Sequence, residues 1–250
     1  MARYLLFQLY APLAAWGDVA VGESRPSATR PGRSALIGLL GAALGIRRDD
    51  EAGQDGLAKG YRFAVRELAQ GSLLRDYHTA QVPSRAALKK APAYTRRDEL
   101  AVEVNTILSA RDYRCDGYWQ VAVEATGDSP PHDLEQLAEA LGRPRFNLYL
   151  GRKACPPALP LQPQIVEADS LQAAFAQGDF TGPEGFVAEL GLIAKGHGLE
   201  QEGGSLYWEA GMEAGISARQ TYTRRDHPRT RFRWQFDERQ EHHGTLSTEE

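Results

Sequence analysis

Cysteine is scarce in this sequence of 250 residues, and long hydrophobic runs are missing. The two cysteines, Cys115 and Cys155, lie 40 residues apart, and neither has a second cysteine or a histidine close by. This spacing is neither a disulfide framework nor a zinc-binding pattern, so we expect a protein of the reducing cytoplasm. The longest apolar run, residues 35–46, is too short for a transmembrane helix, which needs about 20 apolar residues. We therefore expect no membrane partner.

Motifs for catalysis and for metal binding are also missing. The sequence has no GxxxxGK[ST] loop for a nucleoside triphosphate and no GxSxG turn for a nucleophilic serine. It lacks the HxH and HExxH patterns and any paired-carboxylate spacing, and its histidines are isolated except for His242 and His243. We therefore expect neither a metal site nor a cofactor.

Positive charge is present, but it is unevenly spread. The formal net charge is −4, which taken alone argues against a free nucleic-acid-binding protein. Four segments nevertheless carry a local excess of arginine and lysine, of +3, +5, +4 and +5: residues 24–34, 75–97, 143–153 and 219–233. Any one of them could be a solvated loop, whereas four in one acidic chain indicate a basic groove on an acidic body.

The pattern of the first 155 residues predicts an α+β domain. Strands are expected at residues 3–10, 61–68, 113–125 and 145–150, and helices after Ser34 and over residues 132–142. Ser34 is the expected N-cap of the first helix, and Gly45 is its expected end. The resulting order, β-α-β-β-α-β, is that of the ferredoxin-like fold, which RNA-recognition domains use.

A long basic and polar stretch, residues 75–112, interrupts this order between the second and the third strand. It is too long for an ordinary loop, so we interpret it as a functional insertion or a disordered segment. Beyond residue 155 we expect a smaller β-rich region over residues 156–236, and a flexible tail over residues 237–250. The strands expected in the smaller region are residues 163–168, 186–193, 205–209 and 231–236.

Two loops carry candidate ligands for phosphate. Arg25, Arg30 and Arg33 precede the predicted helix, whose N-terminus offers free backbone N–H groups and partial positive charge to an anion. The second loop is Gly151-Arg152-Lys153, whose glycine permits a ligand to approach the backbone closely. On these residues alone, a flexible loop and a simple turn remain as alternatives.

A histidine in the insertion admits three interpretations. His78, beside Arg75 and Tyr77, could act as a general base in RNA cleavage, or its ring could stack on a base. It could equally be a packed or solvent-facing side chain.

Several short motifs in a fixed order resemble those of one family. They are Pro12 and Trp16-Gly17 after the first strand, Arg25-Pro26, the segment 31–34, the helix LIGLLGAALGI, Arg47-Arg48-Asp49-Asp50, Asp76-Tyr77-His78-Thr79, and YLGRKACP. Over residues 3–160 the chain resembles the CasD-like proteins, the Cas-five-type RAMP subunits of type I-E CRISPR systems.

The resemblance implies a noncatalytic RNA-binding subunit of the Cascade complex, which serves antiviral defence by RNA-guided recognition of double-stranded DNA. Such subunits hold the 5′ handle of the crRNA, contact CasA and CasC, and share the complex with CasB and with CasE, the endoribonuclease. The family's β-hairpin thumb has room only in residues 75–112. The implied RNA-binding residues are Arg25, Arg30, Arg33, Ser34, Arg47, Arg48, His78, Lys89, Lys90, Arg96, Arg97, Gly151, Arg152 and Lys153.

A second hypothesis, from another functional class, stays open. Relatives in type I-C systems are themselves metal-independent endoribonucleases that process precursor crRNA. Such cleavage needs a base and a cation near the 2′-hydroxyl group, for which His78 with Arg75, or Tyr77 with Lys89, are the candidates. Because the motifs resemble the branch that has a separate nuclease, we favour the noncatalytic scaffold.

Overall fold

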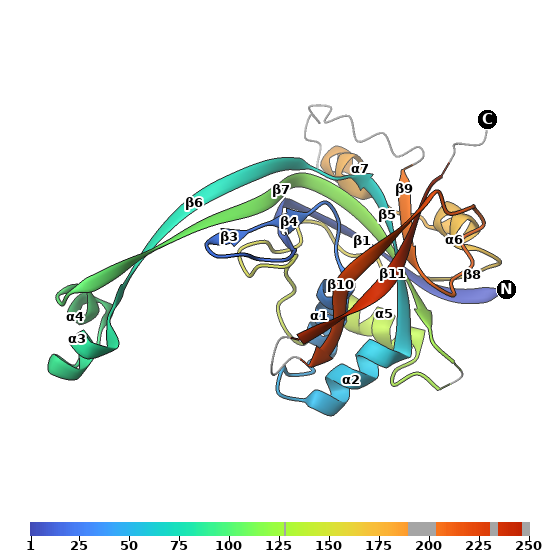
Figure 1. Cartoon of the computed structure of the whole chain (residues 1–250). Helices are drawn as coiled ribbons and strands as arrows, with labels where there is room; N and C mark the ends of the chain where they lie inside the picture. Colours follow the sequence, from blue (N-terminus) through green and yellow to red (C-terminus); the bar gives the residue numbers. More distant parts are fainter. Residues whose placement is uncertain (128, 190–203, 231–234, 247–250) are drawn as a thin grey trace.

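The computed structural model describes residues 1–127, 129–189, 204–230 and 235–246, and it is dominated by one large, mostly antiparallel sheet (Figure 1). The strand order is β10-β11-β9-β5-β7-β1-β8, with β3 and β6 pairing with β7 off this path and β2 pairing with β4 separately. The strands are β1 (Ala2–Ala14), β2 (Trp16–Gly17), β3 (Ser24–Arg25), β4 (Ser27–Ala28), β5 (Tyr61–Ala69), β6 (Ser72–Pro83), β7 (Val104–Ala125), β8 (Gln164–Ala168), β9 (Ser205–Glu209), β10 (Gln220–Thr230) and β11 (Gln235–Thr245). The helices are α1 (Arg33–Leu44), α2 (Glu51–Gly60), α3 (Arg85–Lys90), α4 (Arg96–Leu100), α5 (Leu134–Gly142), α6 (Leu171–Gln177) and α7 (Gly182–Glu189).

The most apolar strands form the centre of the sheet. β1 lies between β7 and β8, and β5 pairs with the other edge of β7. Leu5 and Phe7 of β1 pack with residues of α1 and α5 in one hydrophobic core, while Tyr4 and Leu6 pack with residues of α6 in a second core. Because side chains of a strand alternate between its two faces, each face of the sheet is covered by its own core.

The N-terminus of α1 differs from the prediction. The helix begins at Arg33 with Gly32 as its N-cap, so Ser34, the predicted N-cap, lies inside the first turn. The carboxylate of Asp226 accepts a hydrogen bond from the backbone N–H of Arg33 at 2.8 Å and so caps the helix from a distant strand. Gly45 ends the helix as predicted, with a φ of 78°, a conformation that glycine adopts at low cost.

The long insertion is an ordered β-hairpin. β6 pairs antiparallel with the first half of β7, from Ser72 opposite Cys115 to Pro83 opposite Val104. Figure 1 shows the two strands arching away from the body and ending in the short helices α3 and α4. Neither of these helices contains a buried residue. The polar stretch at residues 75–112 therefore lies within this structure, which we call the β6–β7 hairpin.

The same strand, β7, serves the hairpin and the body. β1 pairs with one edge of β7 from Arg114 onward, and on the other edge β5 takes the place of β6 from Tyr118 onward. At the junction Asp116 has a φ of 55°, and Gly71, across from it, has a φ of 71°. A Cβ on Gly71 would lie 2.5 Å from the backbone oxygen of Cys115, so the chain passes β7 at very close range just before β6 begins.

The strand predicted at residues 145–150 is wrong. Arg145 and Phe146 instead donate backbone hydrogen bonds of 2.9 and 3.1 Å to carbonyl oxygens in the last turn of α1. These bonds use N–H groups that a sheet would need, and they tie the segment to carbonyl groups at the end of the helix. The sheet edge beside β1 is taken by β8, which agrees with the strand predicted at residues 163–168.

Beyond residue 155 the chain extends the same sheet. β9 pairs with β5 and confirms the strand predicted at residues 205–209, and β11 then pairs with both β9 and β10. The boundary predicted at residue 155 therefore does not separate two sheets.

Two other predictions for this region are corrected. Residues 186–189 belong to α7 rather than to a strand, and residues 190–193 of that predicted strand lie outside the described residues. Residues 235–245 form β11, so a flexible tail over residues 237–250 is wrong as far as Thr245. Residues 231–234 of the last predicted strand are also outside the described residues.

Candidate nucleic-acid interface

Three segments from different parts of the chain meet where the β6–β7 hairpin leaves the body. β3 runs parallel to β7 and pairs Arg25 with Arg111. The turn at residues 151–153 lies against both strands, because Arg152 donates hydrogen bonds to the backbone oxygens of Arg25 and Asp112, each at 3.0 Å. The arginine loop and the glycine turn, predicted separately, are therefore one surface.

A further arginine of β7 completes this surface. Arg114 donates a hydrogen bond of 3.2 Å from Nε to the backbone oxygen of Ala28. Lys153 follows Arg152 in the turn, and its side chain is exposed. We call the five cations the root cluster: Arg25, Arg111, Arg114, Arg152 and Lys153.

The acidic residue within the root cluster is hidden from solvent. Asp112 is 7% exposed and accepts hydrogen bonds of 2.8 and 3.0 Å from Arg75. The hydrogen bonds from Arg75, together with the charges of Arg75, Arg114 and Arg152, lower the pKa of Asp112 despite its burial. Arg25, by contrast, is exposed, and its Nη1 donates to backbone carbonyls of its own loop at 2.7 and 2.8 Å. The surface thus presents guanidinium groups, which suit phosphate oxygens.

The backbone at Gly151 makes a close contact, but with the protein itself. Gly151 has a φ of 86°, and a Cβ there would lie 1.8 Å from the backbone oxygen of Ala15. We expected a ligand to approach this glycine, whereas the close neighbour is the end of β1. The role of Gly151 is therefore to seat the turn that carries Arg152 and Lys153.

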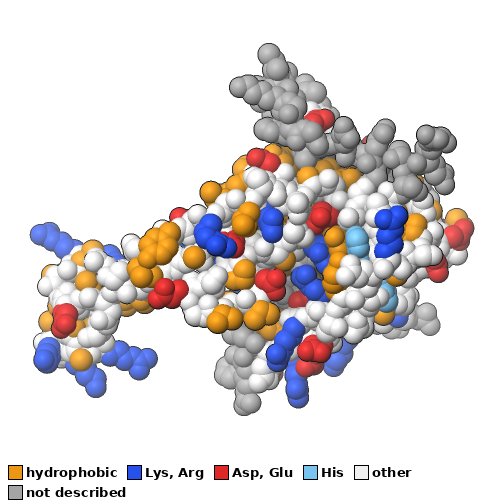
Figure 2. Space-filling view, turned by 45° about the horizontal axis from the view of Figure 1, so that its top comes forward, with side chains coloured by type: hydrophobic (Ala, Val, Ile, Leu, Met, Phe, Trp, Pro, Cys, Tyr) orange, Lys and Arg blue, Asp and Glu red, His pale blue; other side chains and the backbone are white. Residues whose placement is uncertain are grey.

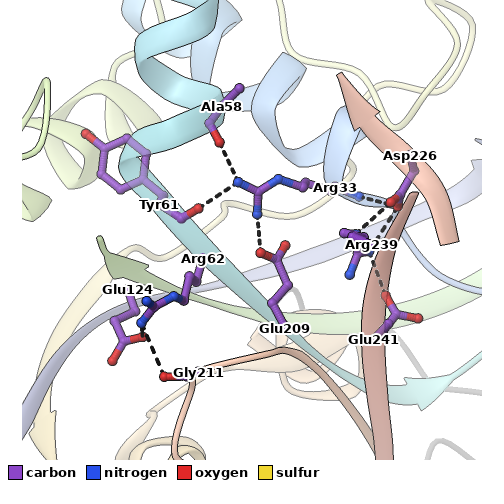
Figure 3. Close-up of polar contacts among 10 residues, drawn as sticks. All are labelled: Arg33, Ala58, Tyr61, Arg62, Glu124, Glu209, Gly211, Asp226, Arg239 and Glu241. Carbon is purple, nitrogen blue, oxygen red and sulfur yellow. Dashed lines mark hydrogen bonds and ion pairs between the residues drawn. The ribbon is translucent and has the colours of Figure 1, made fainter. Parts of the chain in front are cut away.

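Arg30 and Arg33 are not surface cations, contrary to the prediction that they hold RNA. Arg30 is 7% exposed, forms an ion pair with Glu241, and lies 3.5 Å from the centre of the Tyr207 ring. Arg33 is 6% exposed and forms an ion pair with Glu209 (Figure 3). Their partners come from β9 and β11, which the sequence pattern did not place beside the arginine loop. We therefore leave both arginines out of the interface.

The N-terminus of α1 is likewise occupied from within the chain. Arg239 holds the carboxylate of Asp226 with hydrogen bonds of 2.6 and 3.0 Å while Asp226 caps the helix (Figure 3). Burial alone would raise the pKa of Asp226, but the hydrogen bonds and charge of Arg239 outweigh it, so the pKa is lowered. An anion of the protein thus stands where we expected a phosphate.

The remaining candidates near α1 lie apart from the root cluster. Arg47 is exposed and forms an ion pair of 3.2 Å with Asp49. Arg48 is also exposed and lines a cleft between α2 and β10. Both follow the C-terminus of α1, whose 12 residues span about 18 Å. Ser34 is half-buried in the first helical turn.

The β6–β7 hairpin carries the other predicted RNA-binding residues, all of them exposed: His78, Lys89, Lys90, Arg96 and Arg97. His78 lies mid-strand on β6, with Nδ1 2.5 Å from a carboxylate oxygen of Asp76. Figure 2 shows lysine and arginine side chains gathered around the hairpin tip. The hairpin also exposes large apolar side chains: Leu73, Leu74, Tyr77, Val82, Tyr94, Leu100 and Ile107. So many on one insertion mark a contact surface.

The sequence did not single out Arg111 and Arg114 as site residues. Both lie on β7, Arg111 at the end of the predicted insertion and Arg114 at the start of the predicted core strand. Their relation to the arginine loop depends on contacts such as that of Arg114 with Ala28, 86 residues apart. The sequence does show two arginines, Arg111 and Arg114, at the start of a strand that leads into the core. It does not show that the arginine loop lies beside them.

The described part of the chain has no metal site, disulfide or membrane-spanning helix. No group of three or more histidine, cysteine, aspartate or glutamate side chains there could hold a metal ion. Cys115 and Cys155 are free thiols. None of the described helices is long and apolar enough to cross a membrane.

Comparison with known proteins gives matches along nearly the whole chain. The family model described as CRISPR-associated protein (Cas_Cas5) matches residues 4–240. The CRISPR system Cascade subunit CasD of Escherichia coli (strain K12) is 36% identical over 186 residues, which cover 70% of this chain and 76% of that protein.

Solved structures agree with the fold. A chain of a CRISPR RNA-guided surveillance complex has a TM-score of 0.61 and 24% identity, over 97% of this chain and 90% of that one. A crystal structure of a Cas protein has a TM-score of 0.57 and 25% identity, over 98% of this chain and 95% of that one. Together with the family match and the identity to CasD, this likeness shows that the chain belongs to the CRISPR-associated Cas5 family.

Proposed function

We propose that this chain is a noncatalytic subunit of a Cascade-type surveillance complex and holds the 5′ handle of its crRNA. In that role it serves antiviral defence by RNA-guided recognition of double-stranded DNA, in the cytoplasm. The observation that carries the proposal is the root cluster, in which three segments bring five cations together where the hairpin leaves the body, while the nearby carboxylate of Asp112 is buried and paired with Arg75. The relative CasD, a Cascade subunit by name, supports the same role.

The charge arrangement favours RNA backbone as the ligand. Phosphates of a single strand bind clustered arginine and lysine through charge-assisted hydrogen bonds and release counterions as they do so. The net charge of −4 makes the rest of the chain repel RNA on average, so binding is confined to local basic surfaces. The root cluster is such a surface.

We also infer a ferredoxin-like body with the β6–β7 hairpin as its thumb. In support, the strands β8-β1-β7-β5 lie in the order expected for β-α-β-β-α-β connectivity, with β8 in place of the strand predicted at residues 145–150. The exposed apolar side chains of the hairpin favour a protein partner along its length. The partner that we propose for the thumb is the neighbouring CasC, with CasA contacting the body and CasB and CasE elsewhere in the complex.

The endoribonuclease alternative finds little geometric support. His78 is 47% exposed on a regular strand, and its ring is paired with Asp76. A general base for the 2′-hydroxyl group works best beside a fixed cation in a sheltered site. We therefore propose that His78→Ala leaves precursor crRNA processing intact in cells with the complete system. Loss of mature crRNA in an otherwise assembled complex would restore the nuclease hypothesis.

The test of the main proposal is a variant of the root cluster with Arg25, Arg111 and Lys153 replaced by alanine. Each lost phosphate contact flattens the log–log salt dependence of RNA binding by about 0.7 for a single strand, so we expect a change of about 2 in slope. Binding of handle RNA is measured by fluorescence anisotropy over a range of salt concentrations.

A matched control carries the same change of charge at another place. Arg143, after α5, and Arg225 and Arg229, on β10, are not among the implied RNA-binding residues or the root cluster, and all three side chains are exposed. Their alanine variant is expected to keep the salt slope within a few tenths of that of the wild type. Equal losses in the two variants would mean that total charge, not the root cluster, determines binding.

A further inference from the structure

A cleft on another part of the molecule has unusual polar walls. It lies between α2, β9 and the β10–β11 pair, and its volume is about 350 Å³. The charged residues that line it are Arg33, Lys59, Arg62, Glu209 and Arg239. Figure 3 shows the three arginines arranged around the carboxylate of Glu209. We call it the α2 cleft.

Three buried atoms in the wall of the α2 cleft make no hydrogen bond within the described part of the chain. They are Nε of Arg33, Nη1 of Arg239 and Oε1 of Glu209. The Arg33 side chain is only 6% exposed, so it has little contact with bulk water. A buried polar atom without a partner costs about 1–3 kcal/mol, and two donors and one acceptor left over in one cleft call for a common ligand.

The charges around the cleft suit an anion. Lys59 pairs with Asp55 on an exposed surface, which contributes little. Nη1 of Arg62 lies 3.5 Å from a carboxylate oxygen of Glu124 and donates to the backbone oxygen of Gly211 at 3.2 Å, and its other N–H groups form no ion pair within the described part of the chain. Both cations are therefore available at the mouth. Burial raises the pKa of Glu209, against the opposing charges of Arg33 and Arg239. A hydrogen-bond donor at Oε1 of Glu209 would stabilise the ionised form of this carboxylate.

We propose that the α2 cleft binds a phosphate group that carries a proton. The free N–H groups of Arg33 and Arg239 donate to its oxygens, and its hydroxyl group donates to Oε1 of Glu209. Inorganic phosphate keeps such a hydroxyl group in both of the forms it takes near neutral pH. A terminal phosphate monoester keeps it only in part at about pH 6.5, since its second pKa is about 6. Sulfate and the phosphodiesters inside an RNA strand have none, so Glu209 would repel them. The site is distinct from the root cluster and does not depend on it.

The experiment is thermal unfolding of the full chain with low millimolar sodium phosphate or sodium sulfate, at about pH 6.5, where a monoester retains part of its protons. Sodium chloride holds the ionic strength constant. A ligand that binds only the folded state raises the midpoint temperature as it saturates its site. We expect phosphate to do so at concentrations about tenfold below those that sulfate needs, the ratio that one buried hydrogen bond provides.

Two variants and a control locate the effect. Arg62→Gln, at the mouth, is expected to weaken phosphate binding several-fold, whereas Arg47→Gln, outside the cleft, is expected to leave it unchanged. Glu209→Gln places an amide donor where the carboxylate was, so the preference for phosphate over sulfate is expected to disappear. An equal response to both anions in the wild type, or an unchanged phosphate response in Arg62→Gln, would overturn the proposal. A wild type that responds to neither anion would show that the cleft holds water alone.

The source of the phosphate is tested with two RNA oligonucleotides of the same sequence, one with a 5′-phosphate and one with a 5′-hydroxyl group. Tighter binding of the phosphorylated strand, lost in Arg62→Gln, identifies an RNA end. Equal binding of both strands, with the response to inorganic phosphate retained, identifies a small phosphate compound. The root-cluster variant is expected to keep the phosphate response, so a failure of one proposal is distinguishable from a failure of the other.

Discussion

Asp226 shows how much of this protein depends on single ion pairs between distant segments. Its carboxylate caps α1 and is held by Arg239, and both side chains are nearly buried, at 13% and 12% exposure. Arg239 in turn bonds to Glu241, the partner of Arg30. The arginine loop, α1 and the β10–β11 pair are therefore joined by one charged network.

We predict that Asp226→Ala lowers the free energy of unfolding by about 3 kcal/mol, because it leaves Arg239 without its bidentate partner and α1 without its cap. Chemical denaturation followed by circular dichroism measures this change. The control is Asp55→Ala, which removes an exposed ion pair with Lys59 and is expected to cost less than about 1 kcal/mol. Similar losses in the two variants would contradict the role given to Asp226.

The same residue has a pH dependence with a defined sign. The pKa of Asp226 is lowered from its ordinary value of 3.8 in the folded protein, so its stabilisation is present above that value and is lost as the pH falls through the folded pKa. We predict that the stability difference between wild type and Asp226→Asn is constant from about pH 7 to pH 5 and shrinks below about pH 4. A difference that grows on acidification would mean that the pKa is raised instead.

Gly151 gives a prediction for the interface. Gly151→Ala puts a methyl group against the backbone oxygen of Ala15 and strains a positive φ, so the turn must shift. We expect a loss of about 2 kcal/mol in stability and a weaker grip on handle RNA, measured by denaturation and anisotropy. Gly142→Ala, where a Cβ would meet nothing within 4 Å, is the control and is expected to be neutral or slightly stabilising.

At this scale the sequence identified residue types better than partners. Arg25, Arg152 and Lys153 were predicted as surface cations, and the structure brings them together. Arg30 and Arg33 have the same chemistry and the same loop, yet they are buried, because Glu241 and Glu209 reach them from strands more than 170 residues away. Local composition does not show which arginine will form an ion pair with a carboxylate from a distant segment.

Among the elements, the β6–β7 hairpin is the one that extends furthest from the hydrophobic core (Figure 1). Its tip, from Ser84 to Glu103, includes α3 and α4, in which no residue is buried. The tip thus contributes little to the stability of the body. Its exposed cations and apolar side chains indicate a surface for other molecules.

We predict that replacing residues 84–103 by an Asn-Gly turn, which joins the paired residues Pro83 and Val104, leaves the free energy of unfolding within about 1 kcal/mol of the wild type. The same change is expected to abolish co-purification with tagged CasC and crRNA. A shortened protein that melts normally and still assembles would show that the tip is not the contact surface. One that fails to fold would place part of the core in the tip.

Apolar periodicity predicted the elements that hydrophobic packing holds, and missed those held by polar contacts. The apolar residues of β1, β5 and the second half of β7, most of which the structure buries, marked these segments as strands. β11 has few apolar residues, because ion pairs of Arg239 and Glu241 hold it in place. Its polar sequence therefore resembled a flexible tail. Residues 145–150 were wrongly predicted as a strand for the opposite reason. They form a loop, but Leu148 and Leu150 are buried, so their apolar pattern resembles that of a strand.

At the scale of the whole molecule, the sheet crosses the boundary that composition suggested. β8 covers one edge of β1 and β9 covers the free edge of β5. We predict that a fragment of residues 1–155 does not unfold cooperatively, because it leaves both edges open and exposes the core that α6 and Trp208 cover. Calorimetry of the fragment beside the full chain measures this. A sharp transition in the fragment would restore the two-part division.

The hairpin leaves the body at Gly71 and Asp116, two residues with positive φ, so a change of backbone angle at this pivot would swing the whole hairpin. From Cys115 to Val104 the strand is roughly 36 Å long, at about 3.3 Å per residue. A rotation of about 10° at this pivot would therefore move the tip by roughly 6 Å, which is more than one strand spacing. Binding at the tip and binding at the root cluster, which lies beside the pivot, would then be coupled through the backbone angles of Gly71 and Asp116.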